Sequence, residues 1–417
     1  MRTIRLAVIS DLHFRRHSNE ETCRPAAATQ GKSTDPVEGL LTLIQNGSAH
    51  IGFDDDRIAD YLLCPGDIGD MADAAAFNQG WERLKALQKA LGAKHLIAST
   101  GNHEVSSRAS PVDDLAGNVE AEVDPLAAMQ SQNDYPSDLL DPDVGRWVYW
   151  GRGYEIIETG EMLLVLVNSS HFHPTTRANE FERGRIGEVS LSQLRKELLG
   201  RVKSNEDRVF IMLLHHHPIA HESLDVKLGK IPMSNGPNLM EVLAQTGVAW
   251  LVIHGHKHFP RLIYSSDEGA GRSVVFAAGS GGAQLTGDVA EKTRLQFYLV
   301  EASILDQRVM PKAEGRFRAY SWIDRAWQPS VRRKEGLPDR CGYRIPEMDF
   351  QALGVQIKEA LLTSGEKYMK WVELATVVPL LAHILPKDAP TLKKVLASME
   401  VKSTWEDGDY FPKEFSL

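Results

Sequence analysis

The chain has 417 residues, of which 42% are hydrophobic and 25% are charged, and its formal net charge is −9. A chain of this length and composition can bury a large core and has room for an appended module or a second domain. The acidic balance disfavours a general nucleic-acid or membrane-surface binder, because proteins that bind mainly through phosphate contacts present a basic face.

Short apolar runs separated by helical patterns predict an α/β layout. The expected strands lie at 3–10, 59–64, 95–99, 162–168, 208–215, 248–254, 273–278 and 294–301. The expected helices lie at 73–91, 190–203 and 236–246. In the first of these helices, apolar residues recur at three- and four-residue steps, as in a helix with one buried face: Phe77, Trp81, Leu84, Leu87 and Leu91.

Two polar stretches interrupt this pattern, at about 15–57 and at about 105–146. The first contains "RRHSNEETCRPAAATQGKSTDP", and the second is rich in Asp, Pro, Ser and Gly. Long loops inside compact domains are usually functional lids or disordered insertions. We expect both stretches to shape access to a site, with a solvated excursion as the alternative.

The pattern changes again after Glu301. Residues 303–346 are mixed and include "RFRAYSWIDRAWQPSVRRKEG", whereas 349–401 read as several amphipathic helices. We therefore divide the chain into a main domain at 1–302, which carries both insertions, and a C-terminal module at 303–417 whose role the sequence does not indicate.

The cysteines and the first residues of the chain favour a cytoplasmic protein. Cys23, Cys64 and Cys341 are odd in number and far apart, so they predict neither a disulfide framework nor a cysteine metal site. The opening run "MRTIRLAVISDLHF" has no charged leader and no cleavage site. No apolar run approaches the ~18 residues that suggest a membrane span, so we expect no membrane partner.

Residue types that bind metal ions follow five of the predicted strands. The segments are "VISDLHF", "LLCPGDIGD", "IASTGNHEV", "VFIMLLHHHP" and "LVIHGHKHFP". Strands that end at one edge of a sheet bring the residues after them together, so the five loops are expected to converge. Asp11 and His13 are two residues apart, which on an extended strand end directs both side chains to the same side.

The chemistry of this set indicates a dinuclear metal site. Carboxylates, imidazoles and an amide oxygen suit Mn, Fe, Zn, Co or Ni ions. Seven or more such groups are too many for one ion and suit two ions that share a bridging carboxylate. Each motif alone is more often a cap, a turn or a core residue. Five motifs in order, each closing an apolar run, favour the metal site.

The ordered motifs "DLH", "GD", "GNHE", "HHP" and "GHKH" resemble the calcineurin-like metallophosphoesterase superfamily over roughly residues 4–300. The resemblance implies an α/β fold, a four-layer αββα sandwich with a dinuclear centre at the strand ends, followed here by a helical C-terminal extension. It implies that the main domain is catalytic, and that the protein is a metal-dependent phosphoric ester hydrolase.

Carried over position by position, the resemblance implies a ligand set for each of two divalent ions, with Asp67 as the bridge between them. The implied ligands of the first ion are Asp11, His13 and His258, and those of the second are Asn102, His216 and His256. In "HHHP" the family's ligand lies two residues before the proline, which selects His216. His215 is the alternative if the register slips.

The resemblance also implies catalytic roles for two further residues. His103 would be the general acid that protonates the leaving oxygen, a role that suits an imidazole. Asp70 would be the acidic partner that orients His103. The implied reaction is in-line attack on phosphorus by a hydroxide that bridges the metals. Glu104 has no forced role, and Lys257 is expected to point away from the metals.

The substrate class rests on two comparisons within the superfamily. Met71 stands where the protein Ser/Thr phosphatases carry an arginine, which disfavours a phosphoprotein. The segment 163–199 resembles that of bacterial phosphodiesterase-like members, so we favour a phosphodiester, such as a cyclic nucleotide or another nucleotidyl ester. The alternatives are a phosphomonoesterase or a nuclease subunit of a larger assembly. A non-catalytic scaffold is disfavoured because the ligand set and His103 are intact.

Other residues are candidates for contact with the substrate or with partners. His217, His171 and His173 are substrate-side candidates, with core packing or a solvated loop as the alternatives. The basic-aromatic run from Arg316 to Lys334 could bind nucleic acid, although a packing segment is favoured in an acidic chain. A protein partner could bind through the C-terminal module.

Overall fold

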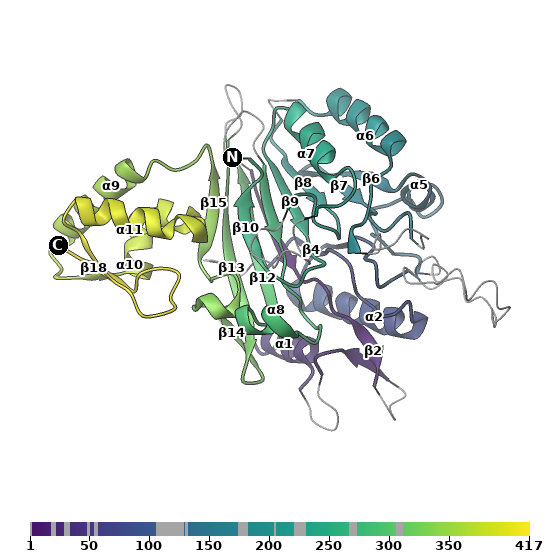
Figure 1. The fold of residues 1–417 in the computed structure, drawn as a ribbon, viewed down its shortest axis with the longest axis horizontal. Helices are drawn as coiled ribbons and strands as arrows, with labels where there is room; N and C mark the ends of the chain where they lie inside the picture. Colours follow the sequence, from purple (N-terminus) through teal and green to yellow (C-terminus); the bar gives the residue numbers. More distant parts are fainter. Residues whose placement is uncertain are drawn as a thin grey trace.

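Two mixed β-sheets form the centre of the molecule (Figure 1). The computed structural model describes residues 2–17, 22–28, 34–47, 51–53, 57–105, 129, 132–173, 182–203, 206–220, 231–266, 273–305 and 312–417. The first sheet has the strand order β14-β13-β12-β1-β4-β5, with β15 also paired to β13. The second has the order β10-β11-β9-β8-β7-β6.

Eight strands of the two sheets are those that the sequence predicts. In the first sheet they are β1 (Arg2–Val8), β4 (Tyr61–Cys64), β5 (His95–Ala98) and β12 (Gln296–Ile304). In the second they are β7 (Met162–Val167), β8 (Val209–Leu213), β9 (Trp250–His254) and β11 (Val274–Ala277). Most of their residues are buried, which explains why these strands read as near-continuous apolar runs.

The strands divide their side chains between separate layers of core. Leu6 and Val8 of β1 pack between the two sheets, whereas Ala7 faces the helices outside the first sheet. Those helices are α1 (Pro36–Gln45) and α2 (Ala74–Leu91), and the outer face of the second sheet is covered by α6 (Glu188–Arg201) and α7 (Gly236–Gln245). The predicted four-layer αββα sandwich is therefore confirmed (Figure 1).

Helix α2 shows how local signals define one of the predicted elements. The Asp73 carboxylate accepts hydrogen bonds from the backbone N–H groups of Ala75 and Ala76 at the helix start. Gly92 ends the helix in the left-handed region, with φ of 68°. The five apolar residues that predicted the helix are all buried against the first sheet.

Several elements lie where the sequence analysis expected none or gave no assignment. They are β2 (Phe14–Arg16), β3 (Cys23–Pro25), α1, α5 (Gly145–Arg152), β6 (Tyr154–Glu158), β10 (Arg261–Tyr264) and α8 (Gly287–Lys292). These elements are short, so their apolar pattern is hard to recognise in the sequence. In helix α1, for example, the buried residues lie in a short window between polar turn formers. The insertions at 15–57 and 105–146 are described only in part, because 18–21, 29–33, 48–50, 54–56, 106–128 and 130–131 lie outside the described residues. That the insertions shape access to the site stays a prediction.

The stretch 313–345 extends the first sheet rather than standing apart from it. It forms β13 (Ala313–Ile323), β14 (Ala326–Pro329) and β15 (Cys341–Ile345), and β13 pairs with β12 along its length. The division at residue 302 stays a prediction, but strand pairing continues well past it. We propose that the separate C-terminal module begins near 349.

Residues 349–417 have a hydrophobic core of their own. The elements around it are α9 (Phe350–Ser364), α10 (Trp371–Val377), α11 (Ala389–Ser398), β16 (Met369–Lys370), β17 (Lys402–Thr404) and β18 (Glu414–Ser416). This module lies at the side of the first sheet beyond β15 (Figure 1). Among the described residues, no helix is both long and apolar enough to cross a bilayer.

Candidate metal centre

The five predicted loops meet at one edge of the two sheets. Asp11, Asp67 and Asn102 follow β1, β4 and β5, which run parallel to one another in the first sheet. His215 and His256 follow β8 and β9, which are parallel neighbours in the second sheet. Because the carboxyl ends of parallel strands lie at the same edge, residues from distant parts of the sequence come together there.

Five residues of these loops have backbone conformations that side chains rarely adopt. Their φ angles are positive: Asp11 (53°), His13 (48°), Asp67 (54°), His256 (79°) and His258 (55°). The sequence analysis assumed that the "DLH" segment is extended, and this assumption is wrong. Asp11 and His13 nevertheless lie close together. Such strain persists only when the surrounding structure enforces it, and it is typical of functional sites.

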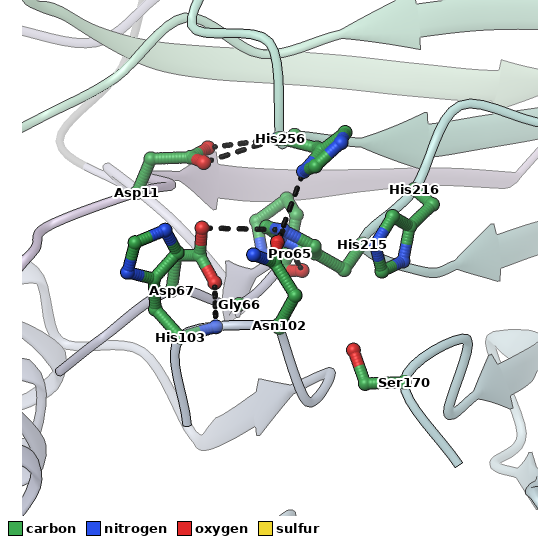
Figure 2. A network of polar contacts seen from close by, with 12 residues as sticks. Asp11, Pro65, Gly66, Asp67, Asn102, His103, Ser170, His215, His216 and His256 are labelled. Carbon is green, nitrogen blue, oxygen red and sulfur yellow. Dashed lines mark hydrogen bonds and ion pairs between the residues drawn. The ribbon is translucent and has the colours of Figure 1, made fainter. Parts of the chain in front are cut away.

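Two glycines allow the loops to approach one another closely. A methyl group on Gly101 would overlap the Asp67 carboxylate, and one on Gly255 would overlap the side chains of Ser10 and Asp11. Backbone N–H groups close to each glycine also donate hydrogen bonds to these carboxylates. His103 N–H donates to Asp67 Oδ1 at 2.9 Å, and His256 N–H donates to Asp11 Oδ1 at 3.0 Å (Figure 2).

The first group of donor atoms consists of Asp11, His13, Asp67 and His258, whose ligand atoms all lie within 4.8 Å of one another. His258 Nε2 is 3.3 Å from Asp11 Oδ1, and His13 Nε2 is 3.5 Å from Asp67 Oδ2. The Nε2 atoms of His13 and His258 face each other at 3.1 Å. Burial lowers the pKa of His13 despite the nearby carboxylates, which favours the neutral imidazole that binds metals.

The second group surrounds Asn102. His256 Nδ1 lies 3.0 Å and His215 Nε2 lies 3.1 Å from Asn102 Oδ1, and His215 Nε2 is also 3.3 Å from Asp67 Oδ2. The opposite ring nitrogens donate to backbone carbonyls, that of His215 to Pro65 at 3.1 Å and that of His256 to Glu182 at 2.7 Å. A carbonyl only accepts, so the nitrogens that face Asn102 are left to bind a cation.

His216 is engaged differently from His215. Its Nδ1 lies 2.8 Å from the Ser169 hydroxyl, and its backbone N–H donates to the same oxygen at 3.1 Å. Its ring is 4.4 Å from that of His256, and it forms a possible ligand group with His215 and His256. Gly184 packs directly on the ring, where any side chain would overlap it.

The electrostatics of the site favour positive charge between its carboxylates. Burial alone would raise the pKa of Asp67, but the charges of His215 and His103 hold it well below its ordinary value. Burial would likewise lower the pKa of His215, whereas the charge of Asp67 raises it to about 9. Buried carboxylates, imidazoles and an amide oxygen that face one another fit divalent cations, because a cation satisfies lone pairs that otherwise repel.

His103 and Asp70 form a close pair beside the first group. His103 Nδ1 donates to Asp70 Oδ1 at 2.6 Å, and His13 Nδ1 lies 3.7 Å from the same oxygen. Burial raises the pKa of Asp70, but the hydrogen bonds from His103 and His13 outweigh it and hold that pKa far below its ordinary value. Asp70 is therefore a carboxylate at neutral pH and orients the His103 ring.

Glu104 is a site residue whose role the sequence analysis missed. Its buried carboxylate accepts hydrogen bonds from the backbone N–H groups of Asp67 at 2.9 Å, Gly69 at 3.0 Å and Gly101 at 2.6 Å. Burial and the charge of Asp67 raise its pKa to about 7. The fourth letter of "GNHE" is the signal that could have found it, because Glu104 ties the loop after β4 to the loop after β5.

We expect Glu104→Ala to destabilise the protein and to weaken metal binding. The substitution leaves three buried N–H groups without an acceptor, and the free energy of unfolding should fall by roughly 3 kcal/mol or more. Urea unfolding followed by circular dichroism measures this change. Glu104→Gln keeps the volume and part of the acceptor function, so it should cost less. An unfolding midpoint equal to that of wild type for Glu104→Ala would contradict the role.

Two of the three substrate-side candidates, His217 and His173, lie beside the histidines of the second group. His217 is buried, donates through Nε2 to the Ile231 carbonyl at 2.9 Å, and its ring stacks 6.0 Å from that of His256. His173 is buried with its ring 5.8 Å from that of His216, and burial lowers its pKa to about 4. His171 is half-buried and packs against Phe172.

Comparison with known proteins adds one family match. The family model described as "Calcineurin-like phosphoesterase" matches residues 4–260. Among solved structures, the chain is similar to a hypothetical protein from Thermus thermophilus at 14% sequence identity, with 78% of this chain and 96% of that chain covered and a TM-score of 0.28. No curated protein matches the chain.

Proposed function

Because the chain belongs to the calcineurin-like phosphoesterase family, we propose that it hydrolyses phosphodiesters with the help of two divalent metal ions. One observation carries the proposal. The carboxylate of Asp67 lies within 3.5 Å of His13 in one donor group and within 3.3 Å of His215 in the other, so a single side chain joins two sets of ligands. Two ions that share a carboxylate suit in-line displacement at phosphorus.

The residues that would hold the ions follow from the two donor groups. Asp11, His13, His258 and Asp67 would hold the first ion. Asp67, Asn102, His256 and His215 would hold the second. When bound, the ions supply positive charge to the phosphoryl oxygens and activate water at neutral pH. The donor set accepts Mn, Fe, Zn, Ni or Co.

His215 is preferred to His216 as the ligand for a geometric reason. His215 Nε2 faces both Asn102 and Asp67, and its other nitrogen donates to a backbone carbonyl, as metal-binding histidines usually do. His216 contacts the Ser169 hydroxyl instead. We therefore propose His215, the alternative that the sequence left open, in place of the His216 register inferred from the proline.

A comparison of His215→Ala with His216→Ala tests this assignment. We expect His215→Ala to retain one of two ions after dialysis and His216→Ala to retain both, because only the first removes a nitrogen that faces Asp67. Elemental analysis by inductively coupled plasma mass spectrometry gives the stoichiometry. The reverse pattern would restore His216 as the ligand.

His103 would deliver a proton to the leaving oxygen. Its ring is partly exposed beside the first donor group, and Asp70 holds Nδ1, so Nε2 is the atom directed away from this partner. A positioned imidazole of this kind typically contributes about 10²- to 10⁴-fold to the rate. Its backbone N–H meanwhile holds Asp67 in place.

Two features support a diester rather than a phosphoprotein or a simple monoester. Met71 is 80% exposed and offers no cation to a phosphomonoester dianion. The segment 163–199, which resembles phosphodiesterase-like members, forms β7, the turn at Ser169 and Ser170, and α6. That turn contacts His216, so it lies against the second donor group. We propose a nucleotide-like diester as the substrate.

The test compares bis-p-nitrophenyl phosphate with p-nitrophenyl phosphate, each with Mn, Ni or Zn ions or with a chelator. The proposal predicts faster cleavage of the diester and loss of activity with the chelator. Preference for the monoester would replace it with a phosphomonoesterase. Cleavage of neither compound by metal-loaded protein would favour a non-catalytic role.

The cysteines support a cytoplasmic location. Cys23, Cys64 and Cys341 are all buried and free of disulfides. Burial raises the pKa of the Cys64 and Cys341 thiols well above their ordinary value, so they are poor nucleophiles. Such thiols suit a reducing compartment, and we propose the cytoplasm on this ground.

A further inference from the structure

A cavity of about 1060 Å³ lies between the first sheet and the C-terminal module of residues 349–417. Its walls come from β13, from the segments 329–332 and 338–340, from the start of α10 and from 406–414. It is remote from the metal centre. Arg316 on the cavity wall lies opposite Glu301 of β12, and Glu301 lies opposite Arg5 in the middle of β1. The cavity is therefore level with the middle of β1, whereas Asp11 of the metal centre lies beyond the end of that strand.

Hydrogen bonds beside the cavity hold the module against the sheet. Next to the wall residue Ala382, the His383 ring donates to the Gly315 carbonyl at 3.2 Å, and Gly342 N–H donates to the Ile384 carbonyl at 3.0 Å. At the 408–409 segment, Arg333 N–H donates to the Gly408 carbonyl at 2.8 Å. These contacts fix the spacing of the walls, so the cavity is part of the fold.

The walls carry more basic than acidic groups, although the chain as a whole is acidic. Six basic side chains line the cavity with four carboxylates. Arg318 pairs with Asp339 at 2.7 Å, and Arg340 lies 3.7 Å from that same, already engaged carboxylate. Within the part of the chain that the structure describes, Arg332 and Lys370 are exposed and form no ion pair. Arg332 and Lys370 are thus available to an anion, and Arg340 lies beside Asp339 in the longer of that carboxylate's two ion pairs.

Aromatic rings lie on the same walls. Phe411 is half-buried and stacks on Trp371, with ring centroids 4.7 Å apart. Phe53 is half-buried, and the Arg316 guanidinium lies 5.0 Å from its ring centroid. Flat rings beside arginines and lysines are the combination that binds bases by stacking and phosphates by charge-assisted hydrogen bonds.

We propose that this cavity binds a nucleoside phosphate, either free or at the end of a single strand. Its volume is at the upper end of ordinary ligand pockets, which are about 300–1,000 Å³, and it accommodates a nucleotide. The phosphate lies near Arg332, Arg340 and Lys370, and the base lies against Phe411. The basic-aromatic run that the sequence analysis noted contributes Arg316, Arg318 and Arg332 to this site. The proposal does not depend on the catalytic function.

Isothermal titration calorimetry of the full-length protein tests the proposal. AMP, a 5′-phosphorylated (dT)₆ strand and inorganic phosphate are titrated separately, with EDTA present so that the metal centre does not bind phosphate. We expect a Kd below about 1 mM for AMP or the strand, and weaker binding of inorganic phosphate. Arg332→Ala/Lys370→Ala and Phe411→Ala should each weaken nucleotide binding at least tenfold. Arg195→Ala on exposed α6 is the matched control and should change nothing.

Each outcome decides the proposal. Binding of AMP supports a free nucleotide as ligand, and binding of the strand alone supports a strand end. Inorganic phosphate that binds as tightly as AMP would overturn the nucleoside assignment. Binding of neither nucleotide probe below 1 mM, or nucleotide affinity unchanged by the cavity variants, would overturn the site itself.

Discussion

Asp67→Asn is expected to abolish metal-dependent hydrolysis, with a fall in kcat of roughly 10³-fold or more, about 4 kcal/mol in the activation barrier. The reason is that Asp67 belongs to both donor groups. The substitution removes the negative charge that both ions would share, and it places an amide N–H₂ or a neutral oxygen toward His13 and His215. Hydrolysis of bis-p-nitrophenyl phosphate, together with metal content, measures the effect.

Asp288→Asn provides the matched control for this experiment. Asp288 lies on the short helix α8, is about half exposed and pairs only with Lys292 on the same helix among the described residues. The same change of charge there should leave metal content and rate within twofold of wild type, since exposed pairs of this kind contribute little. An Asp67→Asn variant that keeps two ions and full activity would exclude a shared-carboxylate site.

His103→Ala is expected to slow hydrolysis by about 10²- to 10⁴-fold, depending on the leaving group. A general acid matters most when the departing oxygen is strongly basic. The loss should therefore be large for a diester with an alkyl or ribose leaving group and small for bis-p-nitrophenyl phosphate, whose nitrophenolate leaves without a proton. Comparing kcat/KM for the two kinds of diester isolates proton donation from a general structural defect.

Two further variants test whether His103 acts as a proton donor. Asp70→Asn should give a smaller loss with the same dependence on the leaving group, because Asp70 acts only by orienting His103. His95→Ala removes a histidine at the opposite end of β5 and should leave both substrates unaffected. An equal loss for good and poor leaving groups in His103→Ala would show that the His103 side chain supports the structure of the site and does not donate a proton.

Much of the candidate site could be predicted because its residues stand directly after apolar strands. The ends of β1, β4, β5 and β9 are marked by "DLH", "GD", "GNH" and "GHKH", and a buried parallel strand has little freedom in where it ends. The glycines within these motifs were informative as well, since Gly101 and Gly255 leave room for neighbouring carboxylates.

The choice between His215 and His216 shows where this reasoning stops. Three consecutive histidines differ only in the direction of their side chains, and a shift of one residue reverses that direction. The direction is set by Pro65 and Ser169, which lie 150 and 47 residues away in sequence from the rings that they contact. Glu104 is similar, because its backbone partners at Asp67 and Gly69 are brought close only by the pairing of β4 with β5.

The sequence by itself determined the order of the central strands along the chain, the face of α2 that is buried and the identity of most candidate ligands, because these depend on local periodicity and on residue type. Tertiary structure alone decided three things: the directions of the His215 and His216 rings, the three hydrogen bonds of Glu104 and the addition of β13, β14 and β15 to the first sheet. It also decided that a basic-aromatic run faces a cavity. These features depend on contacts between segments far apart in the chain, which local patterns do not encode.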